Sequence, residues 1–191
     1  PPQLAPTCCS MTTSDSAARY SRGAIILHWL IALLIIGNFI GAWTSEDLPR
    51  DQKMILMGYH KANGILILLL TLVRIGWRFV YRPPALLGTL KSWEATLARV
   101  THALFYVLML AVPLAGLGLH SAFSQGKPVS LFGLFDFPAL PVGIDKPTIG
   151  LFHELHEVTA TAMLVLIALH VAAALKHQFL DRDGTLARML P

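Results

Sequence analysis

The sequence predicts an all-α integral membrane protein, a bundle of four transmembrane helices. Three observations predict it. Charged residues make up 14% of the 191 residues, whereas soluble domains carry about 25%. The chain contains four separate, mostly apolar stretches, each long enough to cross a membrane, which takes about 20 residues. Most of its 8 histidines fall inside these stretches, where ionisable groups are costly and usually functional.

The four expected spans are separated by polar connections. They are Tyr20–Trp43, Met54–Val80, Leu97–His120 and Phe152–His177. Because the sequence has no internal repeat, we expect one domain over residues 19–191. Residues 1–18 are expected to form a disordered N-terminal extension, with Met11 as the native start. The only two cysteines, Cys8 and Cys9, lie in that extension and are too few for a thiolate metal site.

The basic residues are distributed unevenly between the two ends of the expected bundle. Ten flank the side that carries both termini: Arg19, Arg22, Arg74, Arg78, Arg82, Lys91, Arg99, Lys176, Arg182 and Arg188. Five lie on the other side: Arg50, Lys53, Lys61, Lys127 and Lys146. The positive-inside rule therefore places both termini in the cytoplasm. This distribution also accounts for the net charge of +4, and no nucleic-acid-binding motif is present.

The third connection, residues 121–150, is the longest. Its stretch from Val129 to Phe137 is apolar, but it is short and bracketed by Pro128 and Pro138. Such a stretch is too short for a fifth span. We expect a periplasmic segment that rests on the membrane surface and caps the bundle.

Two histidine pairs at two depths are the main functional signal. His156 and His170 are 14 residues apart, so on a helix they share a face and lie about 21 Å apart along the axis. His28 enters the first span from the same side as His170 and matches its depth, and His60 likewise matches His156. Haem iron takes axial imidazoles from facing helices of a bundle. The spacing therefore predicts two b-type haems, each held by a histidine pair, although polar contacts between helices remain an alternative.

The remaining polar residues of the spans have weaker assignments. His102 lies at the depth of His28 and His170, and is a candidate axial ligand or a partner of a haem propionate. Arg74 follows His60 by 14 residues, which places it at the depth of His28 and His170. It is a candidate partner for a propionate of the haem at that depth, because guanidinium groups bind carboxylates well. His153 is an alternative to His156. Two further histidines lie at span ends. His120 is too shallow for ligation, and His177 lies at the membrane boundary, where it could snorkel or contact quinone.

Several short motifs, taken in order, resemble the bacterial cytochrome b561 family over residues 19–191. They begin with Arg19-Tyr-Ser-Arg, His28-Trp-Leu and His60-Lys-Ala-Asn-Gly, and continue with Leu72-Val-Arg and Pro113-Leu-Ala-Gly. The last three are His156-Glu, the stretch from Ala168 to His177 and the terminal Gly184-Thr-Leu-Ala-Arg-Met-Leu-Pro. The resemblance implies four transmembrane helices in the bacterial inner membrane and two b haems. Its ligand positions match His28, His60, His156 and His170.

The resemblance also implies a reaction. It is nearest to the members that oxidise superoxide and reduce ubiquinone, so we expect a diheme oxidoreductase of that type. Lys61, with Lys53, Lys127 and Lys146, is a candidate for attracting the superoxide anion. An alternative is a haem subunit that links a partner dehydrogenase or hydrogenase to the quinone pool. A third hypothesis is a structural or transport protein whose histidines bind no haem.

Overall fold

The computed structural model describes residues 19–85 and 91–190, and its main feature is four long helices. These are α1 (Arg22–Thr44), α2 (Arg50–Val80), α3 (Ser92–Phe123) and α4 (Lys146–Leu175). All four are long and apolar enough to cross a membrane, which confirms the predicted fold class. The predictions of a disordered extension over residues 1–18 and of a native start at Met11 lie outside the described residues, as do Cys8 and Cys9.

The helices extend beyond the apolar spans that the sequence predicts. α2 has 31 residues and α3 has 32, so each is about 46–48 Å long, whereas the hydrocarbon core is about 30 Å thick. Polar first turns account for the extra length. Asp145, for example, caps α4 by accepting hydrogen bonds from the backbone N–H and the hydroxyl of Thr148, which hold the pKa of its carboxyl below the usual range.

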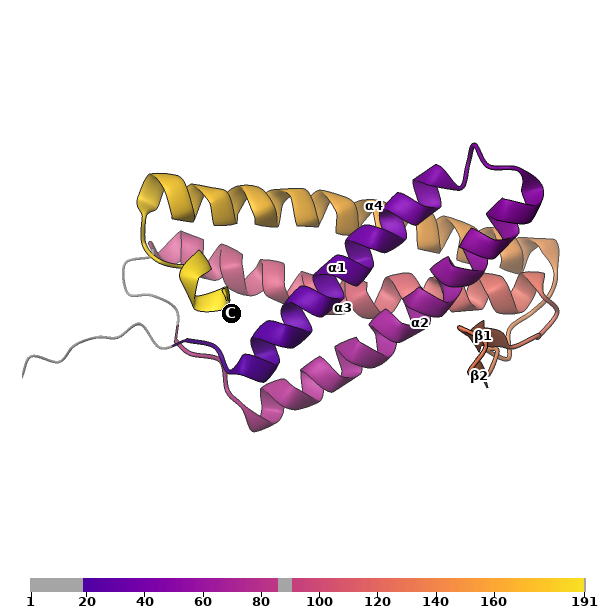
Figure 1. The fold of residues 1–191 in the computed structure, drawn as a ribbon, viewed down its shortest axis with the longest axis horizontal. Coiled ribbons are helices and arrows are strands. Elements are labelled where there is room, and N and C mark those ends of the chain that lie inside the picture. The colour runs from indigo at the N-terminus through magenta and orange to yellow at the C-terminus, as the bar shows by residue number, and fades with distance from the viewer. Residues whose placement is uncertain (1–18, 86–90, 191) are drawn as a thin grey trace, which may run out of the picture.

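The bundle is built from two helix pairs. α1 packs on α2 and α3 packs on α4, while α2 joins the pairs by packing on α3. Figure 1 shows α1 and α2 inclined together across α3 and α4. At mid-bundle, four buried residues, one from each helix, form a shared core: Ile31, Ile67, Met109 and Met163.

One end of the bundle, here called the terminal end, carries the start of α1 and the C-terminal tail (Figure 1). After α4 the chain forms a π-helix (Lys176–Asp181) and a 3₁₀ helix (Leu186–Met189), and this tail turns back toward the start of α1. The Trp29 indole N–H donates to the carbonyl oxygen of Met189 at 2.8 Å, so α1 holds the tail. Arg188 is buried and donates to the carbonyl oxygen of Ala85 at 2.9 Å, which ties the tail to the chain after α2.

The opposite end, here called the hairpin end, carries strands β1 (Val129–Leu131) and β2 (Phe135–Phe137). They form an antiparallel hairpin with Ser130 opposite Asp136. Buried Val129 and Leu131 pack against Ile65 of α2 and Leu117 of α3. The expected cap is therefore a β-hairpin docked on the bundle by alternate residues of β1, and the described residues contain four candidate spans and not a fifth.

Candidate functional site

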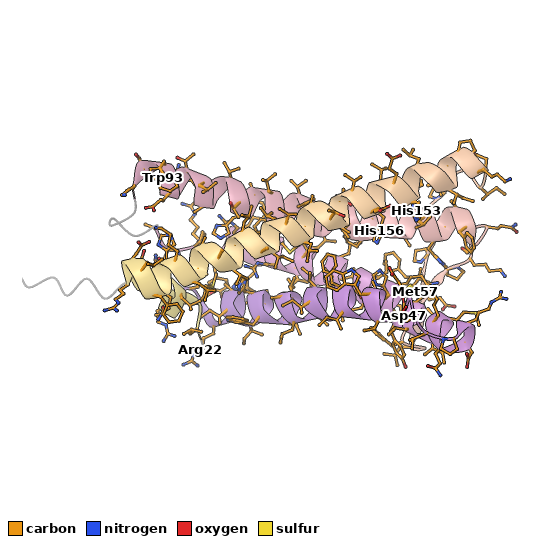
Figure 2. All side chains as sticks on the ribbon, turned by 90° about the horizontal axis from the view of Figure 1, so that it is seen from above. Arg22, Asp47, Met57, Trp93, His153 and His156 are labelled. Carbon is orange, nitrogen blue, oxygen red and sulfur yellow. The ribbon has the colours of Figure 1, made fainter. Side chains whose placement is uncertain are left out.

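At the hairpin end, His60 of α2 faces His156 of α4. The centres of the two imidazole rings are 6.1 Å apart and the ring planes are nearly perpendicular, at 81°. Figure 2 shows His156 and His153 in the hairpin-end half of the bundle, together with Met57 and Asp47.

Backbone carbonyls fix the orientation of both rings. His156 Nδ1 lies 2.9 Å from the carbonyl oxygen of Val112, and His60 Nδ1 lies 3.4 Å from that of Asn38. A carbonyl oxygen only accepts, so each Nδ1 carries the proton and donates it. Each Nε2 is then left with a free lone pair, the form in which a histidine binds a metal.

Small and polar residues of the neighbouring helices support this pair. A Cβ placed on Gly116 of α3 would lie 3.0 Å from the His156 ring, so the glycine makes room for it. On the other side, Asn63 of α2 donates to the carbonyl oxygen of Leu34 at 3.0 Å and to the side-chain oxygen of Asn38 at 3.2 Å. The sequence reasoning assigned no role to Gly116, Asn38 or Asn63. The two asparagines carried a signal that was missed, because amides inside a span commonly join helices.

At the terminal end the structure brings together three histidines. The His28 ring of α1 is 6.4 Å from the His170 ring of α4, and the His102 ring of α3 is 6.0 Å from that same ring. Phe105 packs edge-on against His170, with ring centres 5.2 Å apart. Sequence reasoning placed all three histidines at one depth, and the structure has them there.

Arg74 gives the terminal-end cluster a different chemistry. Its Nη2 lies 3.4 Å from His28 Nδ1, and its Nε donates to the hydroxyl of Tyr106 at 3.4 Å. A fixed cation therefore stands beside His28, where His60 and His156 have a carbonyl oxygen. Tyr106 is a further residue that sequence reasoning missed.

The other candidate histidines belong to neither cluster. His120 donates to the carbonyl oxygen of Lys127 at 3.1 Å, at the start of the loop. The His153 side chain is 67% exposed and lies 3.9 Å from Glu157, so it does not replace His156 in the hairpin-end pair. His177 lies past α4 and pairs with Asp183 at 2.7 Å. Burial opposes the charge of Asp183, but hydrogen bonds from Thr185 and His177 outweigh it and hold the pKa of that carboxyl below its usual value.

The expected lysines lie at the hairpin end. Lys61 is half-buried, directly follows His60, and is within electrostatic range of both His60 and His120. Lys53, Lys127 and Lys146 are exposed.

The ring spacing fits a metal between each pair. Bonds of about 2 Å, each from a nitrogen about 1 Å from its ring centre, place two imidazole centres about 6 Å apart on either side of a metal ion. The observed 6.1 and 6.4 Å match that spacing, and so does the 6.0 Å between the rings of His102 and His170. Imidazole nitrogens are also the axial donors that b-type haem iron uses.

Four membrane-spanning helices with paired histidines at two levels define an integral membrane protein of the b-type cytochrome class. The chain belongs to the prokaryotic cytochrome b561 family, whose sequence model matches residues 19–191.

Its relatives agree with that placement. The chain is similar to cytochrome b561 homolog 2 of Escherichia coli K12, with 33% identity over 94% of this chain and 95% of the relative. It is 32% identical to the probable superoxide oxidase CybB of Yersinia pestis, over 91% of this chain and 96% of that protein. It is also 32% identical to cytochrome b562 of Cereibacter sphaeroides, over 90% and 94% of the two chains. The chain is therefore a multi-pass membrane protein that binds b-type haem and transfers electrons.

Proposed function

We propose that this protein holds two b-type haems, one between His60 and His156 and one between His28 and His170. The observation that carries the proposal is the pair of ring separations, 6.1 and 6.4 Å, at two levels of one bundle. The two levels are about 21 Å apart along α4, because His156 and His170 are separated by 14 residues. Histidine pairs so placed lie toward opposite faces of the membrane.

Two side chains at the terminal end are proposed to assist the haem of that level. Arg74 is half-buried and its guanidinium reaches His28, so it is placed to neutralise a propionate. His102 is the other neighbour of His170 and carries no hydrogen bond to protein among the described residues. Its ring N–H therefore remains able to donate to a propionate.

We propose that the electrons come from superoxide and go to ubiquinone. Each superoxide anion gives up one electron and leaves as dioxygen, so two superoxide anions and two protons convert one ubiquinone to ubiquinol. Bound haem iron supplies reversible one-electron chemistry for this purpose. The name of the Yersinia pestis relative, probable superoxide oxidase, supports this choice of donor.

The residues of this chain would contribute attraction, orientation and insulation. Lys61, beside His60, and the exposed Lys53, Lys127 and Lys146 are placed to attract a small anion to the hairpin end. The carbonyl oxygens of Asn38 and Val112 hold the imidazoles of the hairpin-end pair in the metal-binding tautomer. The apolar core at mid-bundle separates the two histidine levels and excludes water between them.

We further propose that both termini are cytoplasmic, which places the hairpin end in the periplasm. The ten-to-five division of Lys and Arg between the two ends supports this orientation. An alkaline phosphatase fused to the C-terminus should then be inactive, and an active fusion would contradict the orientation.

Turnover of the purified protein with superoxide and a soluble ubiquinone tests the reaction. We expect rapid haem reduction by superoxide that slows as ionic strength rises, because salt screens attraction between charges beyond about 8–10 Å. Neutralising Lys61 together with Lys53, Lys127 and Lys146 should lower the rate and flatten its salt dependence. Reduction of quinone by already reduced protein should not change, because quinone is neutral and arrives through the lipid.

A different result would favour the haem-subunit alternative. In that case superoxide would reduce the haems negligibly at every salt concentration, whereas a partner dehydrogenase or hydrogenase would reduce them readily. The haem assignment would survive that outcome, and the superoxide assignment would not.

A further inference from the structure

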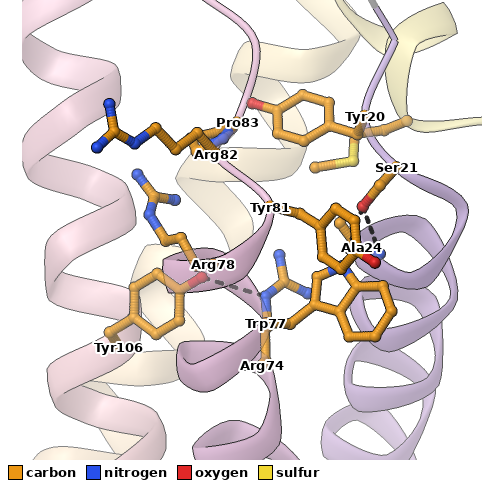
Figure 3. A pocket seen from close by; sticks show the side chains of 11 residues that line it. Tyr20, Ser21, Ala24, Arg74, Trp77, Arg78, Tyr81, Arg82, Pro83 and Tyr106 are labelled. Carbon is orange, nitrogen blue, oxygen red and sulfur yellow. Dashed lines mark hydrogen bonds between the residues drawn. The ribbon is translucent and has the colours of Figure 1, made fainter.

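A small cavity of about 40 Å³ opens at the terminal end of the bundle, beside the histidine cluster of that end. It lies between the start of α1, the last turns of α2 and the side of α3, and Met189 of the tail forms part of its wall. Figure 3 shows its aromatic side chains, which include Tyr20, Trp77 and Tyr106, around the guanidinium groups at the end of α2 and just beyond it.

The cavity is strongly basic. Arg74, Arg78 and Arg82 all line it: Arg74 and Arg78 lie one turn apart on the same face of α2, and Arg82 follows just beyond the end of the helix. No carboxylate lines the cavity, and within residues 19–85 and 91–190 none of the three forms an ion pair with an acidic side chain. Three cations that line one small cavity repel one another, so an anion bound among them would be stabilised.

The three arginines differ in depth. Arg74 is half-buried and its guanidinium contacts His28 and Tyr106. Arg78 and Arg82 are exposed, and Figure 3 shows both pointing toward α3, where Arg78 lies over the Tyr106 ring at 5.8 Å. The inner arginine thus faces the histidine cluster, whereas the outer two are exposed at the end of the bundle.

The surroundings of the outer arginines match the head-group region of a bilayer. Trp77 and Tyr81 stack with ring centres 4.6 Å apart, and such aromatic residues gather where lipid head groups meet water. Next to them, Phe79 is 82% exposed and Val80 is 73% exposed, at the end of a membrane-spanning helix. Phe79 and Val80 do not line the cavity, but a molecule bound there finds cations for a charged group at the end of a membrane-spanning helix.

We propose that this cavity binds the phosphate group of an anionic phospholipid, held by Arg78 and Arg82. Basic pockets between transmembrane helices bind such head groups. A volume of 40 Å³ holds about three waters, enough for the oxygens of one phosphate to replace them. The acyl chains would lie in the bilayer beside the end of α2. The proposal is independent of the electron donor, and it leaves Arg74 to the haem level.

Native mass spectrometry of the detergent-purified holoprotein tests the site. The probes are phosphatidylglycerol and phosphatidylcholine with identical acyl chains, each alone and against added inorganic phosphate. We expect tighter binding of phosphatidylglycerol, and about 30-fold weaker binding by the Arg78→Gln/Arg82→Gln variant, since each arginine contributes about fivefold near a membrane surface. Arg99→Gln is the matched control, because it removes an exposed positive charge of α3 at the same end without touching the cavity.

Each other outcome overturns the proposal. If inorganic phosphate displaces the lipid at equal concentration, the cavity is a phosphate site and not a lipid site. Equal binding of both lipids, or an equal loss in Arg99→Gln, would show only general surface attraction. If the double variant loses haem and keeps its lipid, the arginines serve the haem. Should the double variant fail to fold, Arg82→Gln alone, beyond the end of α2, must still weaken binding about fivefold.

Discussion

The two histidine levels of this bundle are alike in spacing and different in support. At the hairpin end, two histidines face each other and each donates from Nδ1 to a backbone carbonyl oxygen. At the terminal end, three histidines gather around His170, and the contact of His28 is with the guanidinium of Arg74. The first level is fixed by the backbone of neighbouring helices, and the second by charged and aromatic side chains.

This difference indicates how each level can be tuned. A carbonyl oxygen that accepts from Nδ1 makes an imidazole a better electron donor to a metal, whereas a nearby guanidinium favours negative charge and therefore an anionic group such as a propionate. The hairpin-end level is thus insensitive to side-chain changes except where they displace a ring. The terminal-end level depends on several side chains and on the tail that Trp29 holds in place.

The largest expected effect comes from removing one histidine of a pair. His60→Ala and His156→Ala should each reduce the haem content from the proposed two per chain to about one, and His170→Ala should remove the other haem, because a single axial imidazole holds haem far more weakly. Pyridine haemochrome analysis gives the content, and reduced-minus-oxidised spectra show which haem remains.

The control for this experiment is His153→Ala, an exposed histidine one turn before His156. It should keep both haems. If His153→Ala lost one haem and His156→Ala kept both, the hairpin-end ligand would be misassigned although the fold would stand.

A smaller effect should follow from displacing the His156 ring without removing it. The new Cβ in Gly116→Ala would meet that ring at 3.0 Å and shift it from the carbonyl oxygen of Val112. Loss of such support costs about 10–100-fold in affinity for a bound metal group, so the hairpin-end haem should dissociate more readily. Transfer of haem to apomyoglobin measures the rate. Gly64→Ala, where an added Cβ meets nothing within 4 Å, is the control and should leave the rate of haem transfer unchanged.

The terminal-end level can be tested by comparing its two candidate partners of His170. We expect His28→Ala to lose one haem and His102→Ala to keep both, with at most a modest shift of one midpoint potential in a redox titration. The reverse result, loss in His102→Ala and retention in His28→Ala, would make His102 the ligand.

Much of this arrangement could be predicted because helical geometry converts sequence spacing into depth. The 14 residues between His156 and His170 set two levels, and the entry side of each span set which histidine meets which. The four spans were confirmed for the same reason, since about 20 apolar residues have few alternatives to crossing a bilayer.

The rest depends on contacts that leave little trace in a single sequence. The acceptors for His60 and His156 are backbone carbonyls, and every residue has one, so nothing marked Asn38 or Val112. The hairpin was missed because each strand has only three residues, too few for a clear alternation of apolar and polar positions. The return of the tail to Trp29 joins residues 160 positions apart, and neither residue alone predicts it.

The smallest expected effect is a difference in thermal stability between one variant at the terminal end and one at the hairpin end. Trp29→Phe removes the indole N–H that holds the carbonyl oxygen of Met189, next to His28 at the terminal end. A hydrogen bond of this kind contributes about 1 kcal/mol, which corresponds to a lowering of Tm by about 2–4 °C in a protein of this size. Trp43→Phe is the matched control on the same helix. The Trp43 side chain is 56% exposed at the hairpin end, and its indole N–H forms no hydrogen bond in the described part of the chain. Thermal unfolding of the holoprotein, followed at the haem absorption, should show the lower Tm in Trp29→Phe and a change within about 1 °C in Trp43→Phe. If the two variants melted alike, the hydrogen bond from Trp29 to Met189 would contribute nothing measurable to the stability of the terminal end.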